Sequence, residues 1–176
     1  LLDALTVYGT QLWWPMAVSP TMWSSVFIID LAYTLPLLVA CVLTWRWRDS
    51  RGAQRALVLA LTVSSAYLGW SFVAKAKVDR AAEQTLATMG LQDAPRFSVP
   101  MPFNTLLWRA VVVTPTHYYE GYSSLLDGGR PVRWTQHPRG APLYARHQAS
   151  PLVQRVANFS HGFFKMTEAG GNGYIT

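Results

Sequence analysis

The sequence predicts a mostly α-helical membrane protein that ends in a small β-rich or α+β domain. Two apolar runs, 24–45 and 54–74, each reach the length of about 20 residues that a helix needs to cross a bilayer. Charged residues make up 14% of the 176 residues, against roughly 25% in globular domains. We therefore expect two or more transmembrane helices and a division into segments 1–22, 23–90 and 91–176.

Segment 1–22 mixes apolar and polar residues and carries several aromatic rings. It starts without Met or a basic stretch, so we expect a chain truncated at its N-terminus. Its first residues are expected to end a helix that begins upstream, with Gly9 and Pro15 unable to continue it. Trp13 and Trp14 then fall where an interfacial aromatic belt is expected.

The two apolar runs differ in what interrupts them. The first contains Pro36, which a membrane helix tolerates when neighbouring groups satisfy the freed carbonyl. The second contains small and hydroxyl residues, which allow close helix packing. These residues are Ser64, Ser65, Ala66 and Gly69. An amphipathic continuation over 75–90 is expected to end near Gly90.

Residues 46–55 carry four Arg between the two runs. Arg in a short loop between spans favours the cytoplasmic side of the membrane. The N-terminal segment and the C-terminal half would then share the opposite side.

The C-terminal segment has β-branched and aromatic runs separated by turn residues. The expected elements are strands over 106–113, 117–124, 131–135 and 163–166, a turn over 127–129, and a helix over 151–159.

Composition argues against several classes of protein. The net charge of +6 comes mainly from Arg near the ends of apolar runs, with only three Lys, which suits anionic headgroups better than nucleic acid. Cys41 is the only cysteine, so no disulfide within the chain is possible. The four His lie ten or more residues apart and form no HExxH motif.

Two acids are the main candidates for chemistry. Asp30 lies in the first apolar run, where a carboxylate costs roughly 2.5–3.5 kcal/mol and therefore usually faces a partner, a metal or water. Asp3 precedes a polar cluster and could bind a cation. The alternatives are an acid that reaches the interface and an acid at a helix end. With the expected topology, both acids lie near the same membrane face.

Residues 117–122 form an aromatic and polar patch on an expected strand. Alternation places Tyr118, Glu120 and Tyr122 on one face and Tyr119 on the other. The patch serves either cross-strand aromatic pairing or substrate binding, with Tyr119 and Glu120 as candidates for the second role. Three nearby Arg could bind phosphate or lipid headgroups, or form a solvated basic surface. They are Arg130, Arg133 and Arg139.

Residues 1–15 and 25–38 resemble the bacterial inner-membrane metal-dependent hydrolases, a family also described as LexA-binding, membrane-associated hydrolases. Pro102–Arg109 and Tyr118–Tyr122 resemble the C-terminal part of its longer members. The resemblance implies a multi-pass protein of the bacterial inner membrane with a divalent metal ion, for which zinc is a candidate. By this match Asp3 is the expected ligand and Asp30 the second. The companion His residues expected before the Leu-Leu-Asp block are absent from this sequence.

Two hypotheses follow. In the first, metal-activated water attacks an ester or phosphoester of an amphiphilic substrate. Asp3, Asp30 and Gln11 would be catalytic, and Tyr8 and Tyr33 would bind ligands or substrate. In the second, the chain is a non-enzymatic anchor or scaffold whose C-terminal domain binds a protein or lipid. The expected partners are the lipid bilayer, an amphiphilic substrate and a protein regulator, with no nucleic acid.

Overall fold

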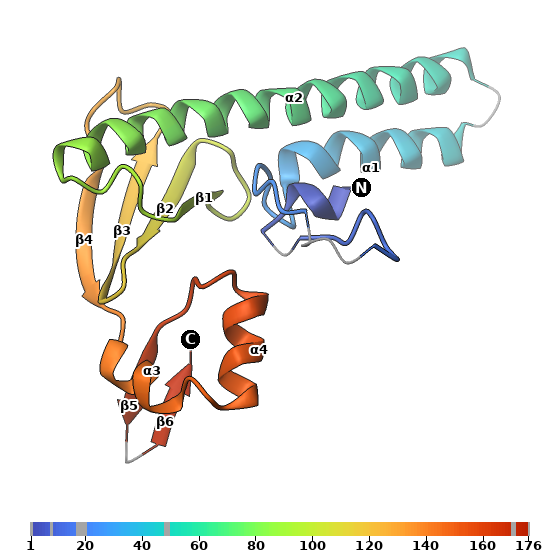
Figure 1. The fold of residues 1–176 in the computed structure, drawn as a ribbon. Coiled ribbons are helices and arrows are strands. Elements are labelled where there is room, and N and C mark those ends of the chain that lie inside the picture. The colour runs from blue at the N-terminus through green and yellow to red at the C-terminus, as the bar shows by residue number, and fades with distance from the viewer. Residues whose placement is uncertain (1, 8, 17–20, 48–49, 170–171, 176) are drawn as a thin grey trace.

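The computed structural model describes residues 2–7, 9–16, 21–47, 50–169 and 172–175 (Figure 1). A helical hairpin lies at one end and a four-stranded sheet packs under the second helix. The elements in chain order are the short 3-10 helix η1 (Leu2–Leu5), α1 (Leu31–Arg46), α2 (Arg51–Thr88), β1 (Arg96–Pro100), β2 (Leu107–Val113), β3 (His117–Ser124), β4 (Arg133–Pro138), α3 (Ala141–His147), α4 (Pro151–Phe159), β5 (Met166–Ala169) and β6 (Asn172–Ile175).

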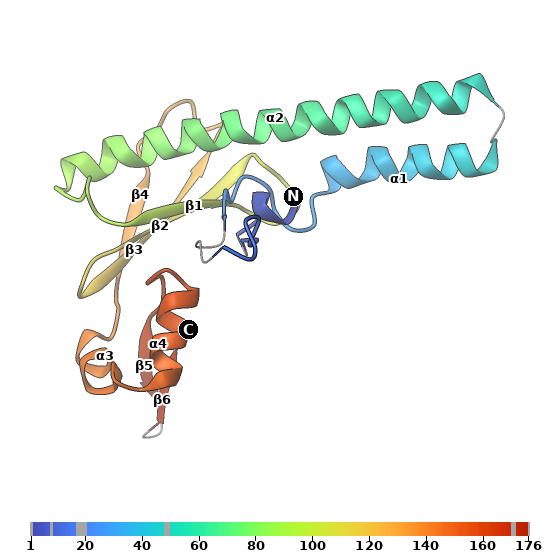
Figure 2. The ribbon, with the colours of Figure 1, turned by 45° about the vertical axis from the view of Figure 1, so that its right-hand side comes forward.

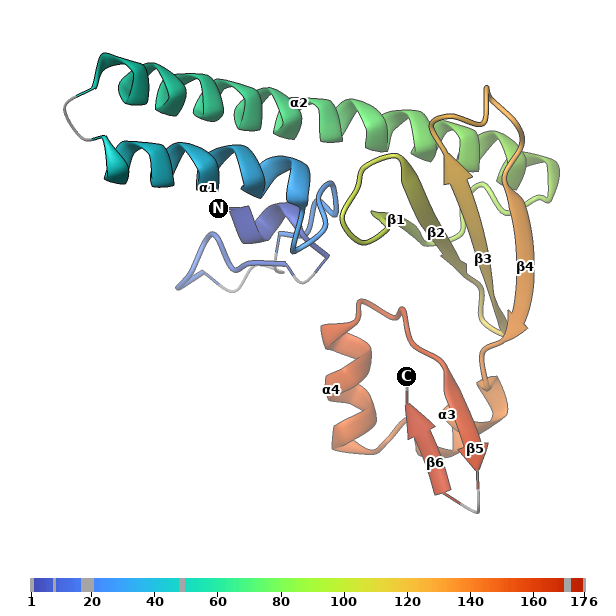
Figure 3. The ribbon, with the colours of Figure 1, turned by 180° about the vertical axis from the view of Figure 1, so that it is seen from behind.

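Helices α1 and α2 run side by side as an antiparallel hairpin (Figures 1 and 3). Small buried side chains let them approach, among them Ala40 on α1 and Ala60 and Ser64 on α2. The Ser64 hydroxyl donates to the main-chain oxygen of Tyr33 at 3.0 Å. The other small residues expected at this interface point away from it. Ser65, Ala66 and Gly69 are exposed.

The expectation of two full spans is wrong for the first run. Residues 24–30 are not helical, because Asp30 is the N-cap at which α1 begins. The 16 residues of α1 extend about 24 Å, less than the roughly 30 Å of a hydrocarbon core. Among the described residues, only α2 is both long and apolar enough to cross a membrane, so a multi-pass topology is not confirmed.

Helix α2 is continuous over 38 residues, from its cap at Ser50 to Thr88. The second apolar run and its amphipathic continuation were both expected to be helical, and the structure confirms them. Near the hairpin tip α2 exposes large apolar side chains, such as Val58 and Leu59, each 64% exposed. Apolar exposure of this kind is typical of a lipid-facing surface.

The sheet is antiparallel in the order β1-β2-β3-β4, and the C-terminal half of α2 covers one of its faces (Figure 2). Ala74 and Val78 on α2 pack against the fully buried Trp108 of β2. Trp134 on β4 donates from Nε1 to the Thr85 hydroxyl at 3.0 Å, which fixes the far edge of the sheet to the same helix.

The expected strands over 106–113 and 117–124 correspond to β2 and β3, and the third expected strand is displaced to β4. Strand β1 was not predicted. The expected helix over 151–159 is α4. The strand expected over 163–166 is wrong, because β5 begins only at Met166.

A second core lies in the C-terminal part. Val153, Phe164 and Met166 are buried together there, between α4 and the β5–β6 hairpin. In Figure 2, the N-terminal segment and the sheet lie at the same end of the helical hairpin.

Candidate functional site

A cavity of about 220 Å³ lies at the base of the helical hairpin, and both candidate acids line it. Its walls come from the N-terminal segment, the loop before α1 and the facing sides of both helices. The lining residues are Leu2, Asp3, Leu5, Thr6, Val26, Phe27, Ile28, Asp30, Tyr33, Thr34 and Leu68. Two acids that are 27 positions apart in the sequence therefore share one cavity.

Asp30 is 2% exposed and both of its carboxylate oxygens accept hydrogen bonds. Oδ1 accepts from the main-chain N–H groups of Ala32 and Tyr33, at 2.9 and 3.3 Å. Oδ2 accepts from the Tyr67 hydroxyl at 2.7 Å. The carboxylate also lies at the N-terminal end of α1, where the helix dipole favours a negative charge. These contacts explain how an acid is accommodated in apolar surroundings.

Asp3 lies in the first turn of η1 and its side chain contacts only hydroxyl groups among the described residues. Thr10 donates to Oδ2 at 3.2 Å, and Thr6 lies 3.5 Å from Oδ1. Thr10 is itself held by paired main-chain hydrogen bonds with Thr21. Unlike Asp30, Asp3 is exposed, and no main-chain N–H of the described residues donates to its carboxylate.

The cavity is electrostatically unbalanced. Two of its lining residues are acids, and none of the described residues that line it is Lys, Arg or His. This donor chemistry and charge fit a hard or borderline divalent cation. The number of ligands is small, since the described residues contain no group of three or more His, Cys, Asp or Glu side chains that could hold a metal. Asp3, with its accessible carboxylate, fits the ligand role better than Asp30.

The other candidate residues fall in different places. Tyr33 lines the cavity, whereas Gln11 is exposed and is not among the lining residues. Tyr8 lies outside the described residues. Tyr119 and Glu120 are neighbours on β3 in the distant sheet and therefore point to opposite faces. The structure does not bring these two residues into the cavity of the acids.

The Glu120 carboxylate forms hydrogen bonds with neighbouring residues of the sheet. Its Oε1 accepts from Arg109 Nε at 2.6 Å and from the Tyr122 hydroxyl at 2.7 Å. The hydrogen bond from Tyr122, together with the Arg109 contacts, lowers the pKa of the Glu120 carboxyl below its usual value. This arrangement is a cross-strand polar cluster.

Sequence reasoning missed a polar cluster where α2 meets β1. Lys75 Nζ lies 2.7 Å from Ser98 Oγ and 3.5 Å from Asp79 Oδ2. The Ser98 hydroxyl donates to Asp79 Oδ1 at 2.5 Å and is 1% exposed. Lys75 and Asp79 are four residues apart on one helix, which was a visible signal, but the position of Ser98 depends on the unpredicted strand β1.

Residues 1–78 match the model of the YdjM inner membrane protein family. The match covers the N-terminal segment, α1 and α2 as far as Val78, and so includes all residues that line the cavity of the two acids. It indicates an inner-membrane protein and is consistent with the bacterial inner-membrane family that the sequence resembles. No curated protein and no solved structure matches the chain.

Proposed function

We propose that the chain is a membrane-bound hydrolase whose active site is the cavity lined by Asp3 and Asp30, with a divalent cation bound at Asp3. The observation that carries the proposal is the pair of carboxylates in one cavity, whose lining, as far as the described residues show, includes no cationic side chain. Hydrogen bonds and the start of α1 stabilise the Asp30 carboxylate, but no described lining side chain balances the negative charge of the pair, and a bound cation would do so.

Each lining residue has a distinct role in this proposal. Asp3 binds the cation, and Thr6 and Thr10 orient its carboxylate through their hydroxyl groups. Asp30 fixes the start of α1 and adds negative charge beside the cation. Tyr33 lines the cavity and would contact the substrate. A bound divalent cation supplies Lewis acidity and lowers the pKa of a coordinated water.

The position of the cavity favours an amphiphilic substrate. Its lining includes apolar side chains from the loop before α1, among them Phe27 and Ile28, and Leu68 from α2. Ile28 and the adjacent Ile29 are more than half exposed beside the apolar hairpin. A substrate with an acyl chain could therefore reach the acids from the lipid phase while its ester or phosphoester group enters the cavity.

One observation favours the alternative, a non-enzymatic membrane anchor. Both oxygens of Asp30 are occupied by the α1 cap and by Tyr67, which is a sufficient structural reason for this acid. Under this alternative, replacement of Asp3 would change neither metal content nor hydrolysis.

The test measures hydrolysis by the full-length protein in lipid nanodiscs. The substrates are an acyl ester, p-nitrophenyl laurate, and a phosphodiester, a short-chain phosphatidylcholine. Asp3→Asn is compared with Asp93→Asn, an exposed acid in the turn after α2 that lies outside the cavity. We expect Asp3→Asn to lose at least about 100-fold in rate, since even indirect ligand partners are worth 10–100-fold, while Asp93→Asn retains activity.

Removal of the metal by a chelator is an independent test of the same proposal. EDTA should abolish hydrolysis by the wild-type protein, and a divalent metal should restore it. Full activity in Asp3→Asn, or no activity in folded, metal-loaded wild type against either substrate, would overturn the proposal in favour of the anchor.

A further inference from the structure

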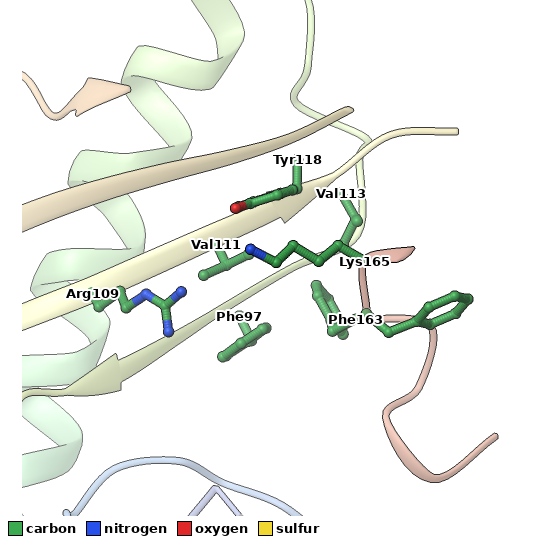
Figure 4. A pocket seen from close by; sticks show the side chains of 8 residues that line it. Phe97, Arg109, Val111, Val113, Tyr118, Phe163 and Lys165 are labelled. Carbon is green, nitrogen blue, oxygen red and sulfur yellow. The ribbon is translucent and has the colours of Figure 1, made fainter. Parts of the chain in front are cut away.

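A second cavity, of about 320 Å³, lies on the sheet face that points away from α2 (Figure 4). Its floor is apolar and comes from Phe97, Val111 and Val113, while Phe163 forms part of the opposite wall. Two cations, Arg109 and Lys165, also line it. In Figure 4 the Lys165 side chain extends across the cavity in the direction of Arg109.

The strand register creates the floor. Phe97 on β1 lies opposite Val111 on β2, and Val113 lies opposite Tyr118 on β3. Paired residues of antiparallel strands point to the same face, and residues two apart on one strand do so as well. Arg109 therefore shares this face with the two valines, while Trp108 and Ala110 point to α2.

The opposite wall is the segment that joins α4 to β5, and Arg139 holds it against the sheet. Its guanidinium donates to the main-chain oxygens of Thr114 and Phe164, each at 3.1 Å, and to that of Gly162. Phe163 also meets Phe97 edge to face, with ring centroids 4.6 Å apart. The cavity is thus pre-formed by contacts between two parts of the fold.

The cations of the cavity are only partly neutralised. Arg109 uses Nε to pair with Glu120, and its two Nη groups have no hydrogen-bond partner within the described residues. Lys165 forms no ion pair with any residue that the structure describes, and its Nζ lies 5.9 Å from the centroid of the Tyr118 ring. With Glu120 counted against Arg109, one positive charge remains beside an apolar floor.

We propose that this cavity binds a single-chain fatty carboxylate. The acyl chain would lie on Phe97, Val111 and Val113, and its carboxylate would accept hydrogen bonds from Lys165 Nζ and the free Nη groups of Arg109. An apolar lining with a few convergent polar groups is typical of small-molecule sites, and the volume lies at the lower end of their usual range. An anion is preferred to a neutral lipid because the cations would otherwise stay unpaired.

This site is separate from the proposed hydrolase cavity. Among the described residues, the two cavities share no lining residue. The residues that line this site also lie outside residues 1–78, which match the inner-membrane family model. Its test involves neither hydrolysis nor a metal, so the two proposals can fail independently.

The experiment titrates the full-length protein in amphipol with [1-13C]decanoate and with decanol, and follows the carboxylate resonance and competition by NMR. Lys165→Ala removes the unpaired cation, and Lys165→Arg retains a charge at that position. Arg80→Ala is the matched control, because Arg80 is an exposed cation on α2 that does not line the cavity. Thermal unfolding of each variant verifies that it is folded.

We expect decanoate to bind more tightly than decanol. In Lys165→Ala the decanoate affinity should fall about tenfold, as for loss of a charge-assisted hydrogen bond, with decanol unaffected. Lys165→Arg and Arg80→Ala should bind decanoate like the wild type. Equal affinity for the two ligands, no saturable binding of decanoate, or undiminished binding in folded Lys165→Ala would overturn the proposal.

Discussion

The hydroxyl of Tyr67 on α2 donates a 2.7 Å hydrogen bond to Oδ2 of Asp30, the residue that caps α1. This contact ties the start of the first helix to the middle of the second. It also fixes one wall of the cavity in which Asp3 lies. The two acids therefore have different roles in our proposal, with Asp30 as the structural anchor and Asp3 as the cation ligand.

The first prediction concerns this hydrogen bond. Tyr67→Phe removes the donor and leaves a buried carboxylate oxygen unsatisfied, so we expect a loss of about 1–3 kcal/mol in the free energy of unfolding. Tyr33→Phe is the control, because no hydrogen bond of its hydroxyl occurs among the described residues. Reversible unfolding in mixed micelles measures both. Equal stability of the two variants would show that the hydrogen bond contributes nothing.

The second prediction separates the capping role of Asp30 from its charge. Asp30→Asn retains a side-chain oxygen that can accept from the main-chain N–H groups at the start of α1, whereas Asp30→Ala does not. We expect Asp30→Ala to lose about 0.5–2 kcal/mol more than Asp30→Asn in the free energy of unfolding. Circular dichroism during denaturation provides the measurement. The reverse order would rule out a cap at Asp30.

The third prediction addresses the polar cluster between α2 and β1. Ser98→Ala removes a hydroxyl that accepts from Lys75 and donates to Asp79, so we expect destabilisation of about 1–3 kcal/mol. Ser65 is an exposed residue on α2, and Ser65→Ala should change the free energy of unfolding by less than about 0.5 kcal/mol. Parallel thermal and chemical unfolding can compare them, and similar effects would contradict a structural role for the cluster.

The fourth prediction is a pH dependence at Glu120. Its pKa is lowered in the folded state, first by the hydrogen bond from Tyr122 and also by Arg109. Its contribution to stability is therefore complete above the unfolded pKa of about 4.3 and is lost as the pH falls through the lower folded pKa. The contribution is under about 1 kcal/mol, because Arg109 is 41% exposed.

Stability curves of wild type and Glu120→Gln test this dependence at low salt. Wild type should be the more stable of the two at pH 7, and the difference should shrink as the pH falls below about 4.3 and through the lower folded pKa. A difference that persists unchanged in acid would mean that ionisation of Glu120 is not its source.

The sequence predicted features that depend on local pattern and failed where distant contacts decide. The long apolar and amphipathic run made α2 predictable, and alternating aromatic and β-branched residues indicated β2 and β3. Strand β1 was missed because its apolar pattern is short and Pro100 lies within it. The start of α1 was missed because apolar residues continue on both sides of Asp30, and hydropathy does not distinguish a buried capping acid from an acid inside a helix.

In the candidate site too, the sequence indicated some residues correctly and missed those that depend on distant contacts. Asp30 was chosen as an acid within an apolar run and Asp3 as an acid before a polar cluster, and both line one cavity. Gln11 was included for its nearness in sequence to Asp3, but the chain turns away and exposes it. The partner of Asp30, Tyr67, lies 37 positions away and could not be identified without the packing of α2 on α1.

The most direct test of the central claim, that a cation binds at Asp3 beside Asp30, is the metal content of the purified full-length protein by mass spectrometry. The account predicts roughly one divalent ion per folded wild-type chain and loss of that ion in Asp3→Asn, with Asp93→Asn unchanged. Folded wild-type protein that holds no divalent ion after incubation with zinc, manganese or magnesium, or an Asp3→Asn variant that retains the ion, would contradict it.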